Sequence, residues 1–425
     1  MPKSASRLER LKTSFVAQAC RCIRFAALLA VVVATGLPPV LAQGRSRAEV
    51  RAEAAALADL GRRLFADPAL SGAGKLACAS CHSPEHAFGP PNGLSVQMGG
   101  SDMRQPGLRA VPSLRYLQAV PAFTEHFFDS PDDADESVDN GPSGGLTWDG
   151  RVDRGAEQAL IPLFSPFEMA NASWAALAKS TLAAGYGPDL ARIYGEKALG
   201  DEQQVVKGVA KALEVFEQDW RTFYPYSSKY DAYLAGKAEL SPQERHGLEL
   251  FDDPAKGNCG GCHISQRGLD GTPPQFTDFG LIAIGLPRNR AIPANAQPDR
   301  FDLGLCGPLR TDFGDRPDYC GLFRTPTLRN AATRTVFFHN GIYHTLREAV
   351  QFYALRDTQP GRIYPRRADG GVDKLDDLPS AYWPNLSTEP PFDRHEGDEP
   401  ALTDAEIDDV VVFIGTLTDG YFDPG

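Results

Sequence analysis

The chain has 425 residues, of which 42% are apolar, and it carries 43 Lys and Arg against 55 Asp and Glu. This composition excludes a disordered or collagen-like chain, because it supplies enough apolar surface for a packed core. The net charge of −12 argues against nucleic acid or anionic lipid as a partner. At this length, two domains are the default expectation.

Residues 1–42 have the pattern of an export signal. Six basic residues precede the apolar run 25–37, and the small residues at 40–42 suit a signal peptidase. The apolar run is too short to span a bilayer with any margin. We therefore expect a signal peptide cleaved near Ala42, which takes the net charge from −12 to −17. Export implies an oxidising compartment, which we interpret as the bacterial periplasm.

An internal repeat organises the rest of the chain. Residues 61–68 and 247–254 share the pattern G-x-x-L-F-x-D-P, and a cysteine motif follows each of them. A helix that ends at Asp-Pro therefore occurs twice, which indicates a duplicated domain. We predict an all-α protein with two cytochrome c-like domains, at 43–235 and 236–425. Because the chain has 41 Gly and 34 Pro, we expect long loops and little sheet.

The motif C-x-x-C-H follows both repeats, at Cys78, Cys81 and His82 and at Cys259, Cys262 and His263. In this motif the two thiols can add to the vinyl groups of a haem while the histidine ligates the iron. The alternatives are a zinc knuckle or a thioredoxin-type redox pair, neither of which requires the histidine. We predict two covalently bound c-type haems.

The segments between the two haem motifs give weaker signals. Residues 129–139 hold six acidic residues, which indicates a solvated loop or, alternatively, a site for a cation or a partner. The pattern predicts a helix over 210–220 and an inter-domain connection over 223–233.

The second half contains three capping boxes and a further cysteine pair. Ser241, Thr345 and Thr403 each precede a Glu by three residues, which predicts helix starts. The last helix should end near Gly420. Cys306 and Cys320 have no nearby histidine, so in an exported protein they predict a structural disulfide that closes a loop.

Several short motifs give the chain a resemblance to the bacterial dihaem cytochrome c peroxidase family, which includes MauG. Besides the two haem motifs, they are W-D-G-R at 148–151, Q-A at 158–159, S-P-F-E-M at 165–169, R-T-P-T-L-R-N at 324–330 and F-H-N-G at 338–341. The resemblance runs from about residue 55 to 418. It implies a two-domain enzyme in which one haem reacts with hydrogen peroxide and the other relays or stores oxidising equivalents.

The resemblance also implies roles for three side chains. Glu168 resembles the group that moves a proton between the peroxide oxygens. Gln158 resembles the family's distal amide, which can orient peroxide without competing for its proton. Trp148 resembles the tryptophan between the two haems. Taken alone, the Glu would be a solvated helix residue and the Trp a core residue.

The axial ligands depend on the few methionines. No Met follows Met169, so the second haem cannot take a Met from its own domain. MauG uses a Tyr at the position that Tyr353 matches, and the resemblance therefore implies Tyr353 as the ligand, against core packing as the alternative. Met98 stands where classical members place a reversible distal His, and it either caps the first iron or lines a loop. We expect the second of these, and structural roles for His246, His339 and His344.

Two departures from the family limit what the resemblance implies. The family often binds calcium between the domains with an Asn side chain, but Ala110 stands at that place, and Arg334 and Val336 stand where two backbone ligands are expected. Calcium therefore lacks its side-chain ligand here. MauG also carries a surface-directed Trp just before its second haem motif, where this chain has Gly257 and Asn258.

These features together predict a periplasmic, peroxide-dependent oxidoreductase on the MauG-like side of the family, which oxidises a partner protein. One alternative is an ordinary peroxidase that draws electrons from a small cytochrome or copper protein. Another is a pure electron carrier, which would need both irons to be six-coordinate and inert to peroxide.

Overall fold

The computed structural model describes residues 45–126 and 141–423. The expected signal segment and the acidic segment 129–139 lie outside these residues. The chain divides into two units, Met1–Arg51 and Ala52–Gly425, and the second contains both C-x-x-C-H motifs. Among the described helices, none combines the length and hydropathy that crossing a membrane would require.

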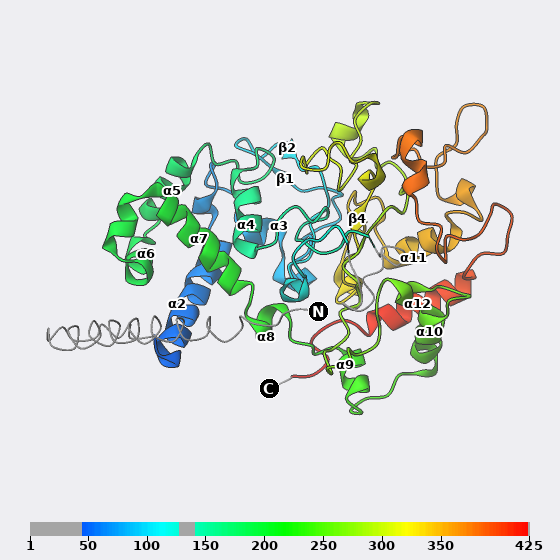
Figure 1. Ribbon diagram of the computed structural model, residues 1–425, viewed down its shortest axis with the longest axis horizontal. Coiled ribbons are helices and arrows are strands. Elements are labelled where there is room, and N and C mark those ends of the chain that lie inside the picture. The colour runs from blue at the N-terminus through cyan, green and yellow to red at the C-terminus, as the bar shows by residue number, and fades with distance from the viewer. Residues whose placement is uncertain (1–44, 127–140, 424–425) are drawn as a thin grey trace, which may run out of the picture. The chain divides into compact units, whose positions relative to one another are not determined.

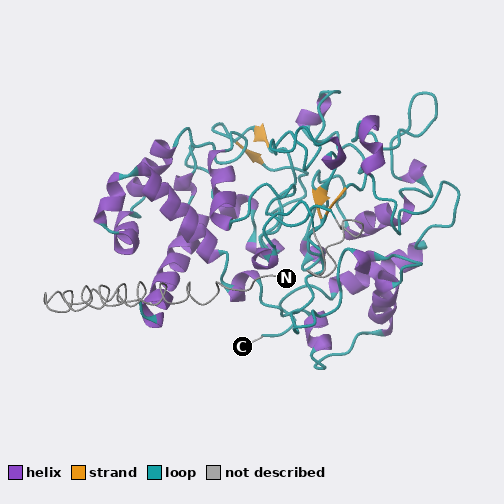
Figure 2. Cartoon of the chain, viewed as in Figure 1, coloured by secondary structure: helices purple, strands orange, loops and turns teal. Residues whose placement is uncertain are grey.

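Helices and loops make up most of the described chain, and the strands are short (Figure 2). The two small sheets are antiparallel and pair Met98 with Pro106 and Leu281 with Arg324. The prediction of a helical protein with little sheet is confirmed. In chain order the elements are α2 (Arg47–Ala66), α3 (Cys78–Cys81), β1 (Met98–Gly99), β2 (Gln105–Pro106), α4 (Gly155–Phe164), α5 (Trp174–Ala183), α6 (Gly187–Tyr194), α7 (Glu202–Phe216), α8 (Trp220–Phe223), α9 (Lys229–Leu234), α10 (Pro242–Asp252), β3 (Leu281–Ile282), β4 (Phe323–Arg324), α11 (Leu346–Leu355) and α12 (Asp404–Gly415).

The helices gather around two apolar cores. Helix α7 contacts α4, α5 and α6, and these helices are drawn in green in Figure 1. Their core includes Leu60, Leu177 and Leu213. Helices α10 and α11 both contact α12, around a core that includes Phe251 and Phe413. The buried residues of the first core fall within 57–223 of the sequence and those of the second within 230–417. The division into domains at residue 235 stays a prediction.

The glycine of each repeat marks a close helix crossing. A Cβ atom on Gly61 would lie 2.0 Å from the backbone oxygen of Ala212 in α7. A Cβ atom on Gly247 would lie 2.1 Å from the backbone oxygen of Asp409 in α12. In both halves the glycine of the repeat therefore lets its helix pack closely against a partner helix, because it has no side chain. Each of these helices precedes a haem motif.

The sequence patterns correctly predicted where several helices begin, and they predicted where helices end less accurately. Ser241, Thr345 and Thr403 all form capping boxes. The last helix ends at Gly415 rather than near Gly420, because the chain turns there to bury Leu417. The helix predicted over 210–220 was misplaced: α7 begins after the cap Asp201 and ends at Phe216.

The predicted connection over 223–233 is partly helical. Ser228 and Asp231 form a capping box that starts α9. Asp231 also receives two hydrogen bonds from Arg329, each 2.9 Å long, and both side chains are buried. A polar, tyrosine-rich segment therefore became a helix because a buried arginine holds its first turn.

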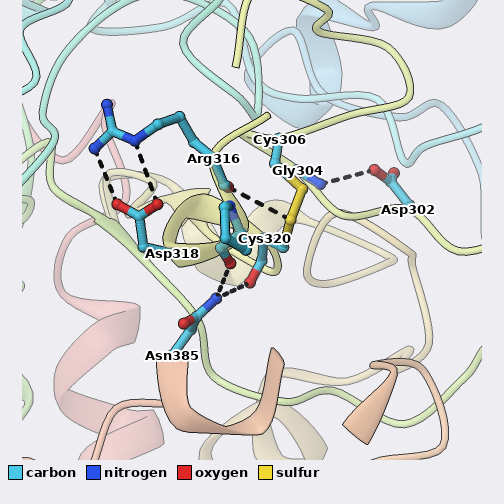
Figure 3. The surroundings of a disulfide bond; sticks show 8 residues. Asp302, Gly304, Cys306, Arg316, Asp318, Cys320 and Asn385 are labelled. Atoms are coloured by element: carbon cyan, nitrogen blue, oxygen red, sulfur yellow. Dashed lines mark hydrogen bonds and ion pairs between the residues drawn. A yellow bond between two sulfur atoms is a disulfide. The ribbon is translucent and has the colours of Figure 1, made fainter. Parts of the chain in front are cut away.

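The predicted disulfide joins Cys306 to Cys320 (Figure 3). The loop between them is closed further by Asn385, whose Nδ2 donates to the backbone oxygens of Pro317 and Cys320. Arg316 pairs with Asp318 within the same loop, as Figure 3 shows. The bridge therefore fastens a loop of the second half, as the sequence predicted.

The substitution Gly247→Ala tests the close crossing of α10 and α12 at the glycine of the second repeat. We expect it to lower the free energy of unfolding by about 2 kcal/mol or more, because the added methyl group overlaps a backbone oxygen of α12. Gly415→Ala is the control, since a Cβ atom there meets nothing within 4 Å, and we expect no loss. Denaturant unfolding of the two holoproteins measures the difference, and equal stability would contradict the close crossing.

Candidate active site

A cavity lies at each of the two haem motifs. The first cavity has a volume of about 370 Å³ and is lined by Cys78, Cys81 and His82. The second cavity has a volume of about 460 Å³ and is lined by Cys259, Cys262 and His263. Both volumes are within the range of cofactor sites.

A short helical turn shapes each motif. In the first motif, the N–H of His82 donates to the backbone oxygen of Cys78 over 2.9 Å. In the second, the N–H of His263 donates to the backbone oxygen of Cys259 over 2.8 Å. Each turn brings the histidine back toward the first cysteine, which is the arrangement that one macrocycle bound by all three residues requires.

Both histidine rings are fixed by a backbone carbonyl. Nδ1 of His82 donates to the oxygen of Phe88, and Nδ1 of His263 donates to the oxygen of Phe276, each over 2.9 Å. Burial lowers the pKa of His82 to about 4 and also lowers the pKa of His263. Each ring is therefore neutral, with Nε2 left as an electron-pair donor for a metal.

The four cysteines fit haem attachment better than zinc or dithiol chemistry. None of them is in a disulfide. Burial raises the pKa of Cys81 and of Cys262 to about 11, whereas a thioredoxin-type pair needs a lowered thiol pKa. Among the described residues, no three His, Cys, Asp or Glu side chains converge as a zinc site would require. The donor set therefore fits a haem in each cavity.

Trp148 lies in the wall between the cavities. It lines both of them. Its indole Nε1 donates to the backbone oxygen of Ala110 over 2.9 Å, and its own backbone oxygen accepts from the N–H of Arg324. Trp148 is thus held from both halves of the chain, by the first half through its indole and by the second through its backbone.

Buried ion pairs hold the turn that carries Trp148. Asp149 is completely buried and accepts hydrogen bonds from Arg109, over 2.7 Å, and from the hydroxyl of Thr147, over 2.6 Å. Arg109 also binds both carboxylate oxygens of Asp302 in the second half. The pKa of Asp302 is lowered by Arg109 against the opposing effect of burial.

Gln158 and Glu168 meet in the first cavity only. Gln158 is on α4, and Glu168 is on the turn that follows it. The N–H of Gly100 donates to the backbone oxygen of Glu168 over 2.8 Å and fixes the turn. Surrounding protein raises the pKa of the Glu168 carboxyl, and Ser165 and Arg151 oppose that shift.

Tyr353 lines the second cavity only, from the face of α11 that also presents Leu346, Ala349 and Val350. Its ring stacks on Phe392 with 5.5 Å between centroids and an angle of 26°. Burial raises the pKa of its hydroxyl. The structure therefore places this phenol in the same cavity as His263.

The remaining methionine and histidines are spread over different surroundings. Met98 is in β1, lines the first cavity and is 41% exposed. His339 lines the second cavity and stacks on Phe323. His246 binds Asp409, and His344 is exposed outside both cavities.

Besides Arg109, two charged residues of the first cavity have no role predicted from the sequence. Arg151 lines it and donates to the backbone oxygen of Leu309. The sequence could have indicated Arg151 as a residue of this site, because it is the last residue of the W-D-G-R motif. Glu217 lines it just after α7, and burial, together with Glu214, raises its pKa to about 8. The sequence could have indicated this buried carboxylate, because Glu217 stands four residues after the core residue Leu213 and so continues the apolar face of a helix.

Backbone oxygens at the place expected for calcium accept hydrogen bonds from side chains of the chain itself. The carbonyl of Ala110 accepts from Trp148, and the carbonyl of Val336 accepts from Nε of Arg334 over 3.1 Å. An arginine thus binds one of the two backbone positions that the resemblance assigns to the cation.

Comparisons with known proteins agree with this geometry. Residues 55–239 match the family model described as di-haem cytochrome c peroxidase. The methylamine utilization protein MauG of Paracoccus denitrificans is 32% identical over 87% of this chain and 90% of its own. Cytochrome c551 peroxidase of Nitrosomonas europaea is 26% identical over 71% and 74%.

A solved structure has a fold similar to that of this chain. The diheme peroxidase BthA of Burkholderia thailandensis superposes with a TM-score of 0.74 and is 42% identical, over 86% of each chain. The chain belongs to the family of dihaem cytochrome c peroxidases that includes MauG, whose members are hydrogen-peroxide-dependent oxidoreductases.

Proposed function

We propose that the two cavities hold covalently bound c-type haems with different tasks. The first reacts with hydrogen peroxide, and the second holds oxidising equivalents that are drawn from a partner protein, in the manner of MauG. The observation that carries this proposal is the distribution of side chains. Trp148 lines both cavities, Gln158 and Glu168 line only the first, and Tyr353 lines only the second.

The residues of the first cavity suit the handling of peroxide. A haem bound through Cys78, Cys81 and His82 supplies the redox chemistry that cleaves the O–O bond. Glu168, as a carboxylate, accepts a proton from one peroxide oxygen and returns it to the departing oxygen. Gln158 donates an amide hydrogen bond that orients peroxide and does not titrate.

The residues of the second cavity suit storage. His263 and Tyr353 would hold the second iron, because the phenol shares a cavity with the histidine and no Met follows Met169. An anionic phenolate favours oxidised iron more than a thioether does. The second site is therefore suited to keep an oxidising equivalent until a partner supplies an electron through Trp148 or through the surface.

The proposed location is the periplasm. Residues 1–42 have the signal pattern, and thioether formation and the Cys306–Cys320 bridge both suit export to an oxidising compartment. A partner protein or small electron donor would meet the chain there.

Two haems per mature chain is the first expected outcome. Each C-x-x-C-H motif offers two thiols that are not in disulfides, and both are needed for attachment. Intact-protein mass spectrometry after export, with a metal assay, measures the number. One haem per chain, or bound zinc, would contradict the assignment.

Glu168→Gln should slow the reaction with peroxide by about 10²–10⁴ while both haems stay attached, because the proton carrier is lost. Stopped-flow spectroscopy measures the rate. Glu157→Gln is the control, since Glu157 is an exposed neighbour on α4, and it should react at the parent rate.

The pH dependence gives a second check on Glu168. The carboxylate is the active form, and burial raises its pKa above the usual 4.5. The parent rate should therefore fall as the pH drops through this raised pKa, and the Gln variant should lose that dependence. A Gln variant that reacts at the parent rate would remove Glu168 from the proposal.

Tyr353→Phe should convert the second haem from low spin to high spin, because the phenol oxygen is lost while the ring remains packed on Phe392. Electron paramagnetic resonance of the ferric protein measures the change. Tyr343→Phe is the matched control, since Tyr343 packs on the same cluster but does not line the cavity. If Tyr353→Phe stays low spin, the ligand is another residue, and His339→Gln tests one of the other histidines that line that cavity.

A further inference from the structure

The arginines that line the second cavity fall into two kinds. Among the described residues there are four of them, and Arg115 and Arg329 form ion pairs with Asp419 and Asp231, each over 2.9 Å. The other two, Arg324 and Arg334, form no ion pair with any described carboxylate.

These two guanidinium groups bind only backbone oxygens. Nε of Arg324 donates to Thr147 over 3.2 Å. Nε of Arg334 donates to Val336 over 3.1 Å, and its Nη2 donates to Val111 over 3.0 Å. Carbonyl groups are neutral, so each guanidinium keeps its full positive charge.

A charge that protein largely surrounds is costly to leave without a partner of opposite charge. Burial lowers the pKa of Arg324 and of Arg334 to about 10. Asp149 attracts Arg324, but its carboxylate is already bound by Arg109 and Thr147. No other charge offsets the burial of Arg334. The cavity therefore offers two cations without anions.

Both groups lie at the wall that divides the cavities. Thr147 precedes Trp148 and lines both cavities, and Val111 lines the first. Each arginine thus reaches from the second half to the segment that holds the indole. The first cavity offers no equivalent pair, because Arg109 and Arg151 both lie within ion-pair distance of Asp149.

We propose that Arg324 and Arg334 would bind the two carboxylates of a haem held in the second cavity, at the wall around Trp148. A haem carries two carboxylate side chains, which match the two unpaired cations in number and charge. The pairing also makes these arginines positioning residues for electron transfer between the sites. This inference rests on the proposed haem in the second cavity.

The test compares charge-removing with charge-keeping substitutions. Arg324→Gln and Arg334→Gln each keep a donor for the backbone carbonyl and remove the cation, whereas Arg324→Lys and Arg334→Lys keep both. We expect each Gln variant to shift the second haem about tenfold toward its ferric form, which is about 59 mV for a one-electron couple. The Lys variants should stay within about threefold of the parent. Spectroelectrochemical titration of the holoprotein measures these shifts.

The outcomes separate this inference from the proposed function. One haem per chain would overturn the proposed function and the inference with it. Two haems, with Gln and Lys variants that titrate alike, would overturn the inference alone. If a Gln variant does not fold, resonance Raman spectra of the Lys variants decide. The bands of the haem carboxylate chains should shift when a forked guanidinium becomes a point charge, and unchanged bands would overturn the inference.

Discussion

The fully buried carboxylate of Asp149 is the constraint on which the two sites depend. It is bound by Arg109, which also binds Asp302 across the two halves of the chain. Breaking a buried pair of this kind costs about 3–5 kcal/mol, because the partner charge is left uncompensated. The turn of Asp149 also carries Trp148, so the same interaction that joins the halves sets the position of the indole between the cavities.

The two cavities share the C-x-x-C-H motif and the wall around Trp148, and they differ in their other functional side chains. Each has two thiols and one histidine whose Nδ1 donates to a backbone oxygen. The first adds a carboxyl and an amide, which are groups that move and orient protons. The second adds a phenol and two unpaired guanidinium groups, which are groups that bind metal and carboxylate. Under the proposed function, the two sites serve successive parts of one reaction.

Local signals in the sequence predicted what local chemistry determines. The capping boxes, the Asp-Pro helix ends and the Cys306–Cys320 bridge were right because neighbouring residues decide them. The helix at Lys229–Leu234 was missed although Ser228 and Asp231 form a local capping box at its start. The buried partner that holds this turn, Arg329, is about a hundred residues away in the sequence. The unpaired state of Arg324 and Arg334 was equally beyond the sequence, since it depends on where every acidic residue lies. The roles of Glu168 and Tyr353 came from the family resemblance, and the structure adds the cavity in which each residue lies.

The central claim is that the two sites are chemically different, with one open to peroxide and the other closed by a phenol. Electron paramagnetic resonance of the untreated ferric protein tests this claim most directly. We predict one high-spin and one low-spin haem in equal amounts, because His263 and Tyr353 are proposed to ligate the second iron while the first keeps an open side for peroxide. Two low-spin signals would contradict the account, since both irons would then be six-coordinate and the chain would be an electron carrier.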